Sequence, residues 1–577
     1  MYRTAIDRFG FTDGFDPTGE SWRPAWGLYS ELLLRTLMTL RHVAGSRGLE
    51  PVPDIAASDP HVSADGLTYT FHLKHGVKFG PPFSRDVTAR DIEYAFERID
   101  TRSLSAQYGS YYDGVIVGMT GAATAPAPIS GIETPDRSTI VFHLQRPTGD
   151  FLFRLALPAT APIPERVARC FPKAGRYGRY LIASGPYMIA GEEKLDASSC
   201  DALEPISGFS PRHGLAIVRN PDYDPSTDSP ELRANNIDGV QILVDRNRDR
   251  ILRGIEAGNL DGSWVSPLVK PQEAGPGEPA LSYHSDLDGR TRYLTMNMLV
   301  PPFDDVAVRR AVNFAIDKRE LRQIWGGPPW GDAATHVFSP AFLDTGPQQL
   351  DPYATPFHAG DADLARREMA RSRYDTNGDG VCDASVCRNV LYISRSAPPE
   401  VDMVPTIFRD LATIGLRLRY REQVIDNCEP YVGTVRNLIP ITSCEGPEQD
   451  PTDPARFAMA FDSAGIRCYG QTNTSELGMT ASRARGCGVE DQYQQVKGEV
   501  PSADRDIARC AALSGGLARQ CWARFDDALM TKYVPWVPYL WSKTVTVTGP
   551  AVVHYEFDQF SGTISFCHIA LANPVRR

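Results

Sequence analysis

Residues 67–99 constrain the fold more than any other stretch, because two elements and the break between them follow from one short segment. Apolar and polar residues alternate over 67–74, which is the period of a half-buried strand. A glycine- and proline-rich break follows at 76–82. Thr88 and Asp91 then form a capping-box pattern ahead of an apolar run, which predicts the start of a helix. A strand, a break and a helix in this order occur in many folds, so other segments are needed to identify the fold class.

Length and composition indicate a folded, soluble protein of several domains. A chain of 577 residues is too long for one ordinary core, so we expect two or three domains. Hydrophobic residues make up 42% and charged residues 23%, as in globular proteins. The formal net charge is −11 and the basic residues are dispersed, so we expect no nucleic-acid or anionic-membrane partner. No apolar run approaches about 18 residues, so no membrane span is predicted.

The eleven cysteines favour an exported protein. The simplest pairing joins sequence neighbours: Cys170–Cys200, Cys382–Cys387, Cys428–Cys444, Cys468–Cys487 and Cys510–Cys521, with Cys567 left over. Sequence cannot fix this connectivity, and a set of buried free thiols is the alternative. No Cys/His cluster has zinc-site spacing, so a structural zinc site is not expected.

Residues 375–383 have the chemistry of a calcium loop. A hard cation needs several oxygen ligands, and alternating side chains plus one carbonyl can wrap it. The candidate ligands are the side chains of Asp375, Asn377, Asp379 and Asp383 and the carbonyl of Val381. The twelfth position is Val386 rather than glutamate, so the loop is not a complete EF-hand. We expect a structural calcium ion, and the alternative is a polar turn closed by a Cys382–Cys387 disulfide.

Eight segments in order resemble the peptide/nickel class of extracellular solute-binding proteins, the receptors that feed ABC importers. The two strongest are 67–99 and 301–317, the second with Asp304 and Asp305 ahead of an apolar helix face. The opening segment includes an expected helix around 28–39. The other matching segments include 50–56, 139–149, 184–189, 219–223 and 533–540. The resemblance covers most of the chain outside roughly 455–520.

The resemblance implies an α/β fold of the periplasmic-binding-protein-like class II (cluster C). In this fold two lobes, one with an extra inserted domain, are joined by a hinge and enclose the ligand between them. We expect lobe I to comprise residues 1–50, 183–283 and 536–577, with the inserted domain at 51–182. Lobe II is then expected at 284–535.

The resemblance also implies candidate ligand-binding residues. In peptide-binding members an aspartate pairs with the free α-ammonium of the ligand, since a buried cation must be paired. Asp450 falls at that position, but Pro447 and Pro451 replace the family's Trp and Tyr, so an ordinary loop or N-cap role is the alternative. Aromatic side chains are expected to line the pocket, and the candidates are Trp264, Tyr431 and Trp536. The alternative for each is a place in the core.

The function implied is that of a receptor that hands oligopeptides or peptide-like ligands to ABC permease subunits in the membrane. We expect a monomer, lipid-anchored on the extracellular face or periplasmic. The chain begins MYRTAIDRFG without a signal segment, which indicates a cytosolic protein or, as we expect, a mature region with an added Met1. No catalytic motif is present, so we do not expect an enzyme.

Two alternatives stay open. The ligand could be a non-peptide, such as a sugar conjugate, a metallophore or a nickel complex. Pro447 and Pro451, which replace the family's aromatic residues, support this alternative. The protein could also be a family member recruited as an enzyme or a regulator.

Overall fold

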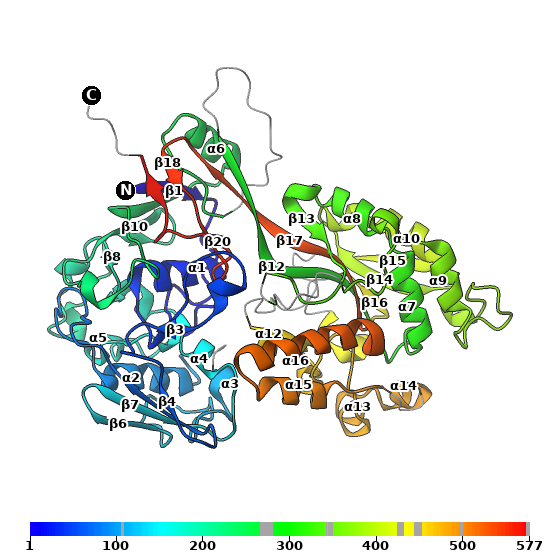
Figure 1. Cartoon of the computed structure of the whole chain (residues 1–577), viewed down its shortest axis with the longest axis horizontal. Coiled ribbons are helices and arrows are strands. Elements are labelled where there is room, and N and C mark those ends of the chain that lie inside the picture. The colour runs from blue at the N-terminus through cyan, green and yellow to red at the C-terminus, as the bar shows by residue number, and fades with distance from the viewer. Residues whose placement is uncertain are drawn as a thin grey trace. The chain divides into compact units, whose positions relative to one another are not determined.

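The computed structural model describes residues 1–104, 109–265, 281–341, 343, 350–423, 432–443, 453–496 and 500–572. Contacts divide the chain into two compact units: unit 1 comprises Met1–Asp286 and Thr544–Arg577, and unit 2 comprises Leu287–Lys543. Two long strands cross the sequence boundaries between them, β12 (Ser282–Met296) and β17 (Trp536–Thr548) (Figure 1). Unit 1 is therefore discontinuous in sequence, whereas unit 2 is one unbroken stretch.

A five-stranded sheet forms one part of unit 1. Its order is β1 (Tyr2–Ile6), β11 (Gly239–Val244), β10 (Gly214–Arg219) and β8 (Tyr187–Ile189), with β9 (Phe209–Ser210) paired to β10. β1 runs parallel to β11, and the other pairs are antiparallel. β11 buries Val240 and Ile242 while Gln241 and Leu243 are exposed, which is the alternation of a strand with one covered face.

A second, antiparallel sheet of unit 1 has the order β4 (His61–Val62), β5 (Thr68–His72), β7 (Thr139–His143) and β6 (Ile132–Asp136). Helix α2 (Ala89–Asp100) packs against it, with Phe96 and Phe142 ring centroids 5.2 Å apart. The Asp91 carboxylate accepts the Thr88 backbone N–H at 2.9 Å, which closes the capping box. The strand and helix predicted within 67–99 are confirmed.

The helix expected around 28–39 is wrong beyond its first turns. A π-helical segment, η1 (Leu28–Leu33), ends at Leu34, whose backbone is extended (φ −125°, ψ 154°). Residues Met38–Thr39 then form β2, which pairs with β3 (Val52–Pro53). Just past the turn, the guanidinium of Arg35 binds the buried Asp54, so a tertiary contact overrides the local helical preference.

Short elements complete unit 1. Its remaining helices are α1 (Arg23–Gly27), α3 (Gly109–Tyr112), α4 (Phe151–Arg154), α5 (Glu165–Ala168) and α6 (Arg248–Glu256). After β17 the chain forms β18 (Val552–His554), β19 (Phe557–Asp558), β20 (Thr563–Ile564) and β21 (Ala570–Leu571), in the pairs β18–β21 and β19–β20.

Unit 2 is built on a mixed six-stranded sheet. Its order is β13 (Gly331–Ala333), β17, β12, β16 (Ile441–Thr442), β14 (Val390–Arg395) and β15 (Leu418–Gln423). Its helices are α7 (Val306–Ala315), α8 (Lys318–Ile324), α9 (Ala362–Met369), α10 (Glu400–Ala412), α12 (Pro454–Phe457), α13 (Ala481–Cys487), α14 (Glu490–Gln495), α15 (Asp504–Ala511) and α16 (Gly515–Ala528). The helix expected within 301–317 is α7, and the Asp305 side chain caps it by accepting the Ala307 N–H at 2.9 Å.

Four of the expected disulfides are confirmed: Cys170–Cys200, Cys382–Cys387, Cys468–Cys487 and Cys510–Cys521. Cys567 is free and buried. The remaining expected pair, Cys428–Cys444, lies outside the described residues. Short loops between partners explain why pairing sequence neighbours succeeded.

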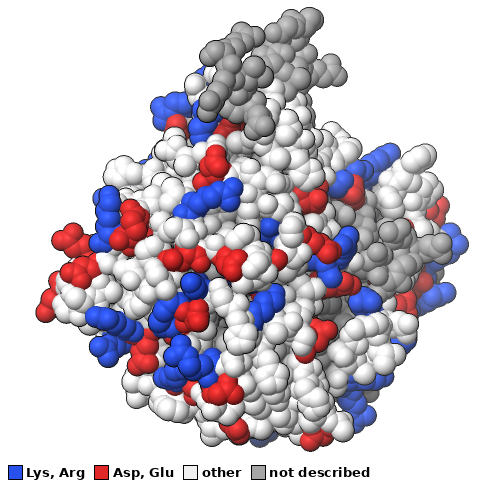
Figure 2. All heavy atoms as spheres, turned by 60° about the vertical axis from the view of Figure 1, so that its left-hand side comes forward, with Lys and Arg blue, Asp and Glu red and all other residues white. Residues whose placement is uncertain are grey.

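Acidic and basic side chains are mixed over the face drawn in Figure 2, which is the pattern of a solvated surface. Among the described residues, no helix is both long and apolar enough to cross a bilayer.

Candidate ligand-binding site

Trp536 begins β17 and lies in an aromatic cluster of unit 2. Its ring stacks on Tyr293 with centroids 3.4 Å apart and planes 3° from parallel. Phe461 and Phe457 approach it at 4.5 and 6.0 Å. The side chain is 1% exposed, and its indole N–H has no hydrogen-bond partner among the described residues. Trp536 thus combines core packing with an unused donor, and its ligand role stays a prediction.

Trp264 has similar surroundings in unit 1. Trp22, Phe566 and Phe9 surround its ring, with centroid distances of 5.3, 6.0 and 6.3 Å. It too is 1% exposed, and no described residue accepts a hydrogen bond from its indole N–H. The two tryptophans therefore belong to separate units, each in an aromatic cluster with an indole N–H that no described residue accepts.

Asp450 and Tyr431, the other two candidates, lie outside the described residues. The description of this segment resumes at Asp453, three residues after Asp450. The Asp453 side chain accepts the Ala455 N–H at 3.0 Å and so caps α12. Asp453 thus has a helix-capping role.

The candidate calcium loop is organised around its own carboxylates. Asp375 accepts the N–H groups of Gly378 and Gly380 at 2.7 and 2.6 Å. Asp379 accepts the Val381 N–H at 2.9 Å, and Asp383 accepts the Thr376 hydroxyl at 2.6 Å. Gly380 has φ +83°, and a Cβ there would lie 2.6 Å from the Arg366 side chain, so the turn requires glycine.

These contacts arrange the loop without testing whether calcium binds, and the five ligands stay a prediction. We expect Ca²⁺ to raise the melting temperature of the protein, because an ion at one hundred times its Kd stabilises the folded state by about 2.7 kcal/mol. Asp379→Asn keeps an oxygen for the Val381 N–H but removes a charge, so it should reduce the shift. Asp363→Asn, at an exposed aspartate on α9, is the control. Equal shifts in all three proteins, measured by differential scanning fluorimetry, would exclude this loop as the site.

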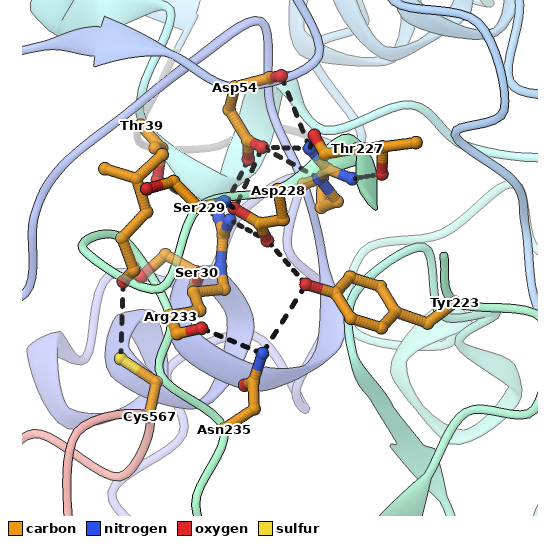
Figure 3. Close-up of polar contacts among 12 residues, drawn as sticks. Ser30, Thr39, Asp54, Tyr223, Thr227, Asp228, Ser229, Arg233, Asn235 and Cys567 are labelled. Atoms are coloured by element: carbon orange, nitrogen blue, oxygen red, sulfur yellow. Dashed lines mark hydrogen bonds and ion pairs between the residues drawn. The ribbon is translucent and has the colours of Figure 1, made fainter. Parts of the chain in front are cut away.

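A buried ionic network lies in unit 1 around Asp54 (Figure 3). The Asp54 carboxylate accepts from Arg35 Nε and from Arg233 Nη2, both at 2.8 Å. Arg233 also pairs with Asp228 at 2.9 Å, and Asp228 accepts the Tyr223 hydroxyl at 2.9 Å. The four charged side chains are at most 2% exposed, and their formal charges cancel.

The network sets the ionisation of Asp54. Burial opposes the charged form, but the Arg233 and Arg35 charges outweigh it and hold the pKa of the carboxyl well below its usual value. The network joins Arg35 and Asp54 to a segment around Arg233 that lies 179 positions beyond Asp54 in the sequence. No local pattern signals it, so the sequence analysis missed it.

The family model for bacterial extracellular solute-binding proteins, family 5 Middle, matches residues 50–437. The dipeptide-binding protein of Escherichia coli (strain K12) is 26% identical over 283 residues, which cover 47% of this chain and 46% of that protein. The heme-binding protein A of Haemophilus influenzae is 25% identical over 330 residues, 56% of this chain and 53% of that protein. The chain thus spans about half the length of the curated relatives it matches.

Solved structures resemble the whole chain. The clavulanic acid biosynthesis oligopeptide binding protein 2 superposes with a TM-score of 0.77 at 23% identity, covering 99% of this chain and 95% of that one. The murein tripeptide binding protein MppA, in its unliganded open form, gives 0.68 at 17% identity, covering 100% and 98%. These likenesses confirm the α/β, two-lobed fold of the periplasmic-binding-protein-like class. Together with the family match over 50–437, they show that this chain belongs to the bacterial extracellular solute-binding proteins of family 5.

Proposed function

We propose that this protein is an extracellular receptor that captures oligopeptides or peptide-like molecules and delivers them to the permease of an ABC importer. The family match over residues 50–437 carries the proposal. Relatives named as dipeptide-, oligopeptide- and di/tripeptide-binding proteins support the class of ligand. The proposal includes a monomer that is lipid-anchored or periplasmic, and a binding role without catalysis.

In this proposal Asp450 pairs with the α-ammonium of the ligand, and Trp264, Tyr431 and Trp536 provide apolar surface and donors. The buried, unused indole N–H groups of Trp264 and Trp536 support the assignment, because a ligand carbonyl can accept from each. Ligand binding then favours the closed state of the hinge by its greater affinity for that state.

A receptor for a non-peptide ligand is the second candidate. Pro447 and Pro451 replace the aromatic residues that accompany the ammonium-binding aspartate in peptide receptors. Relatives of this class are named for other ligands too, as in the heme-binding protein A and in AgaA in complex with agropinic acid. A role as an enzyme or a regulator is a third reading.

Native mass spectrometry of the purified protein, before and after mild denaturation, tests which ligand class applies. We expect released masses that differ by amino-acid residues. A single non-peptide mass would favour the second candidate and remove the peptide proposal. If no ligand is retained, calorimetric titration with a mixed peptide library replaces the release step, and absence of any heat would count against peptide binding.

Asp450→Ala is expected to weaken peptide binding by at least about 2 kcal/mol, or about 30-fold, because the ligand ammonium is left unpaired. Asp453→Ser is the matched control, since serine also caps helices and should keep the affinity of the wild type. Calorimetric Kd values that are equal for Asp450→Ala and the wild type would remove Asp450 from the site.

A further inference from the structure

Three buried side chains from the two ends of the chain meet in unit 1. Glu31 lies on η1, His42 lies in the loop after β2, and Asp558 ends β19. One nitrogen or carboxylate oxygen from each lies within 4.8 Å of the others. All three residues are 0% exposed. Within the described ranges, they are the one group of three His, Cys, Asp or Glu side chains gathered this closely.

Several polar atoms in this cluster lack the hydrogen bonds that buried groups need. Neither ring nitrogen of His42 makes a hydrogen bond of good geometry in the described part of the chain, and neither does Glu31 Oε1; both side chains interact with the neighbouring Asp558 carboxylate instead. Such groups are rare in folded proteins and call for a physical explanation. A bound species that accepts lone pairs from nitrogen and oxygen would explain why these atoms have no hydrogen-bond partners among the described residues.

The distance between His42 and Asp558 suits two ligands of one ion. His42 Nδ1 lies 3.5 Å from Asp558 Oδ2. Hydrogen bonds from nitrogen to oxygen are about 2.7–3.2 Å long, so this separation is too great for a good one. Two ligands of a tetrahedral ion, each bound at about 2.1 Å, lie about 3.4 Å apart.

Backbone N–H groups hold the two carboxylates of the cluster, those of Asp558 and Glu31, in place. Asp558 Oδ1 accepts the Phe560 N–H at 3.0 Å, and its Oδ2 accepts the Ser561 N–H at 3.1 Å. Glu31 Oε2 accepts the Cys567 N–H at 3.2 Å, while Oε1 has no hydrogen-bond partner among the described residues. Both carboxylates are thus oriented without use of every lone pair.

The loop that carries His42 is also specialised. His42 has φ 55°, in the left-handed region that side-chain-bearing residues rarely adopt. Strained backbone of this kind clusters at functional positions. On the Glu31 side of the cluster, a Cβ at Gly27 would lie 2.9 Å from Glu31 Oε1, so glycine leaves room next to the unpartnered oxygen.

We propose that Glu31, His42 and Asp558 bind a divalent transition-metal ion of the zinc type. One imidazole nitrogen and two carboxylate oxygens are a normal zinc donor set, and a double positive charge neutralises both buried carboxylates. Calcium and magnesium prefer six or more oxygen ligands, which this cluster does not offer. The ion fastens the returning C-terminal segment to the N-terminal segment of unit 1, and its role is structural. The proposal departs from the sequence-based expectation of no structural zinc site, which rested on the absence of a Cys/His cluster with zinc-site spacing; this donor set contains no cysteine, and its members are far apart in the sequence.

Metal content of tag-free protein tests the proposal. The protein is stripped with a chelator, incubated with Zn²⁺ in the presence of excess Ca²⁺ to occupy hard-ion sites, passed through gel filtration and measured by inductively coupled plasma mass spectrometry. We expect one zinc per chain and a higher melting temperature. Loss of even an outer-shell partner weakens metal affinity about 10- to 100-fold, so His42→Gln should weaken it at least as much.

Two further variants keep the test independent of folding. Glu31→Gln preserves shape and the Oε acceptor for Cys567, and should lose zinc while keeping the wild-type circular dichroism spectrum. His336→Gln alters a histidine of unit 2 that is buried against Asp526 at 2.7 Å, and should retain zinc. Replacement by Co²⁺ should give visible absorption bands that His42→Gln abolishes. Zinc well below one per chain in the wild type, or equal zinc in the wild type and His42→Gln, would overturn the proposal.

Discussion

Replacing Asp54 by alanine is expected to lower the free energy of unfolding by about 3–5 kcal/mol, because the change removes one partner of a buried ion pair. Arg35 and Arg233 both donate to the Asp54 carboxylate, and neither side chain is more than 1% exposed. Without the carboxylate, two guanidinium groups remain close together and out of water. Asp228 compensates only one of them, since it pairs with Arg233.

Chemical denaturation followed by far-ultraviolet circular dichroism measures this loss. Glu490→Gln is the control, because it removes a carboxylate that also pairs with arginine, Arg485, but at the surface. Exposed pairs contribute about 0–1 kcal/mol, so the control should stay close to the wild type. A loss below about 1 kcal/mol for Asp54→Ala would show that the network does not depend on its central carboxylate.

The same residue gives a pH signature. The folded-state pKa of Asp54 is lowered below its unfolded value of about 3.9, so its contribution is complete above that pH. The contribution is lost as pH falls below about 4 toward the folded-state pKa. The gap in stability between the wild type and Asp54→Ala should therefore narrow on acidification below pH 4 and stay constant from about pH 5 to 7.

Trp536→Ala is expected to lower the free energy of unfolding by a similar amount, about 3–5 kcal/mol, but for a different reason. The change removes a ring that stacks on Tyr293 and leaves a cavity beside Phe457 and Phe461. Trp536→Phe keeps much of that surface and should cost less. Tyr469→Ala, at a side chain that is 68% exposed, should change stability by no more than about 0.5 kcal/mol.

Stability and ligand affinity separate the two roles of Trp536. If the indole N–H binds ligand, Trp536→Phe should weaken binding while stability changes little, since phenylalanine has no donor. If Trp536 is only a core residue, affinity should follow stability across the two variants. Denaturation midpoints and calorimetric Kd values on the same preparations decide between these outcomes. Wild-type stability in Trp536→Ala would contradict the packing argument itself.

Local signals in the sequence predicted the local structure. The alternation in 67–74, the capping box of α2 and the N-cap of α7 all depend on residues within a few positions of one another, and all three elements are confirmed. The prediction failed at 28–39, where a distant partner determined the conformation. Arg35 there binds Asp54, and β2 pairs with β3.

The candidate site was likewise predictable only in part. Aromatic residues such as Trp264 and Trp536 can be chosen from sequence, but their stacking partners come from other segments of the chain. Nothing in the sequence brings Glu31 and His42 close to Asp558, because the chain between them includes the whole of unit 2. Contacts between such distant segments appear only once the fold is known.

The discontinuity of unit 1 has a consequence for biosynthesis. Domains generally fold as units, and those nearest the N-terminus fold first as the chain emerges from the ribosome. Here that order is reversed, because the unit that contains Met1 also needs Thr544–Arg577, which are synthesised after the whole of unit 2. All residues of unit 2 are synthesised before those that complete unit 1. Until residues 544–577 emerge, the nascent protein therefore carries an incomplete unit 1, and this is the interval in which a chaperone can hold that part of the chain unfolded.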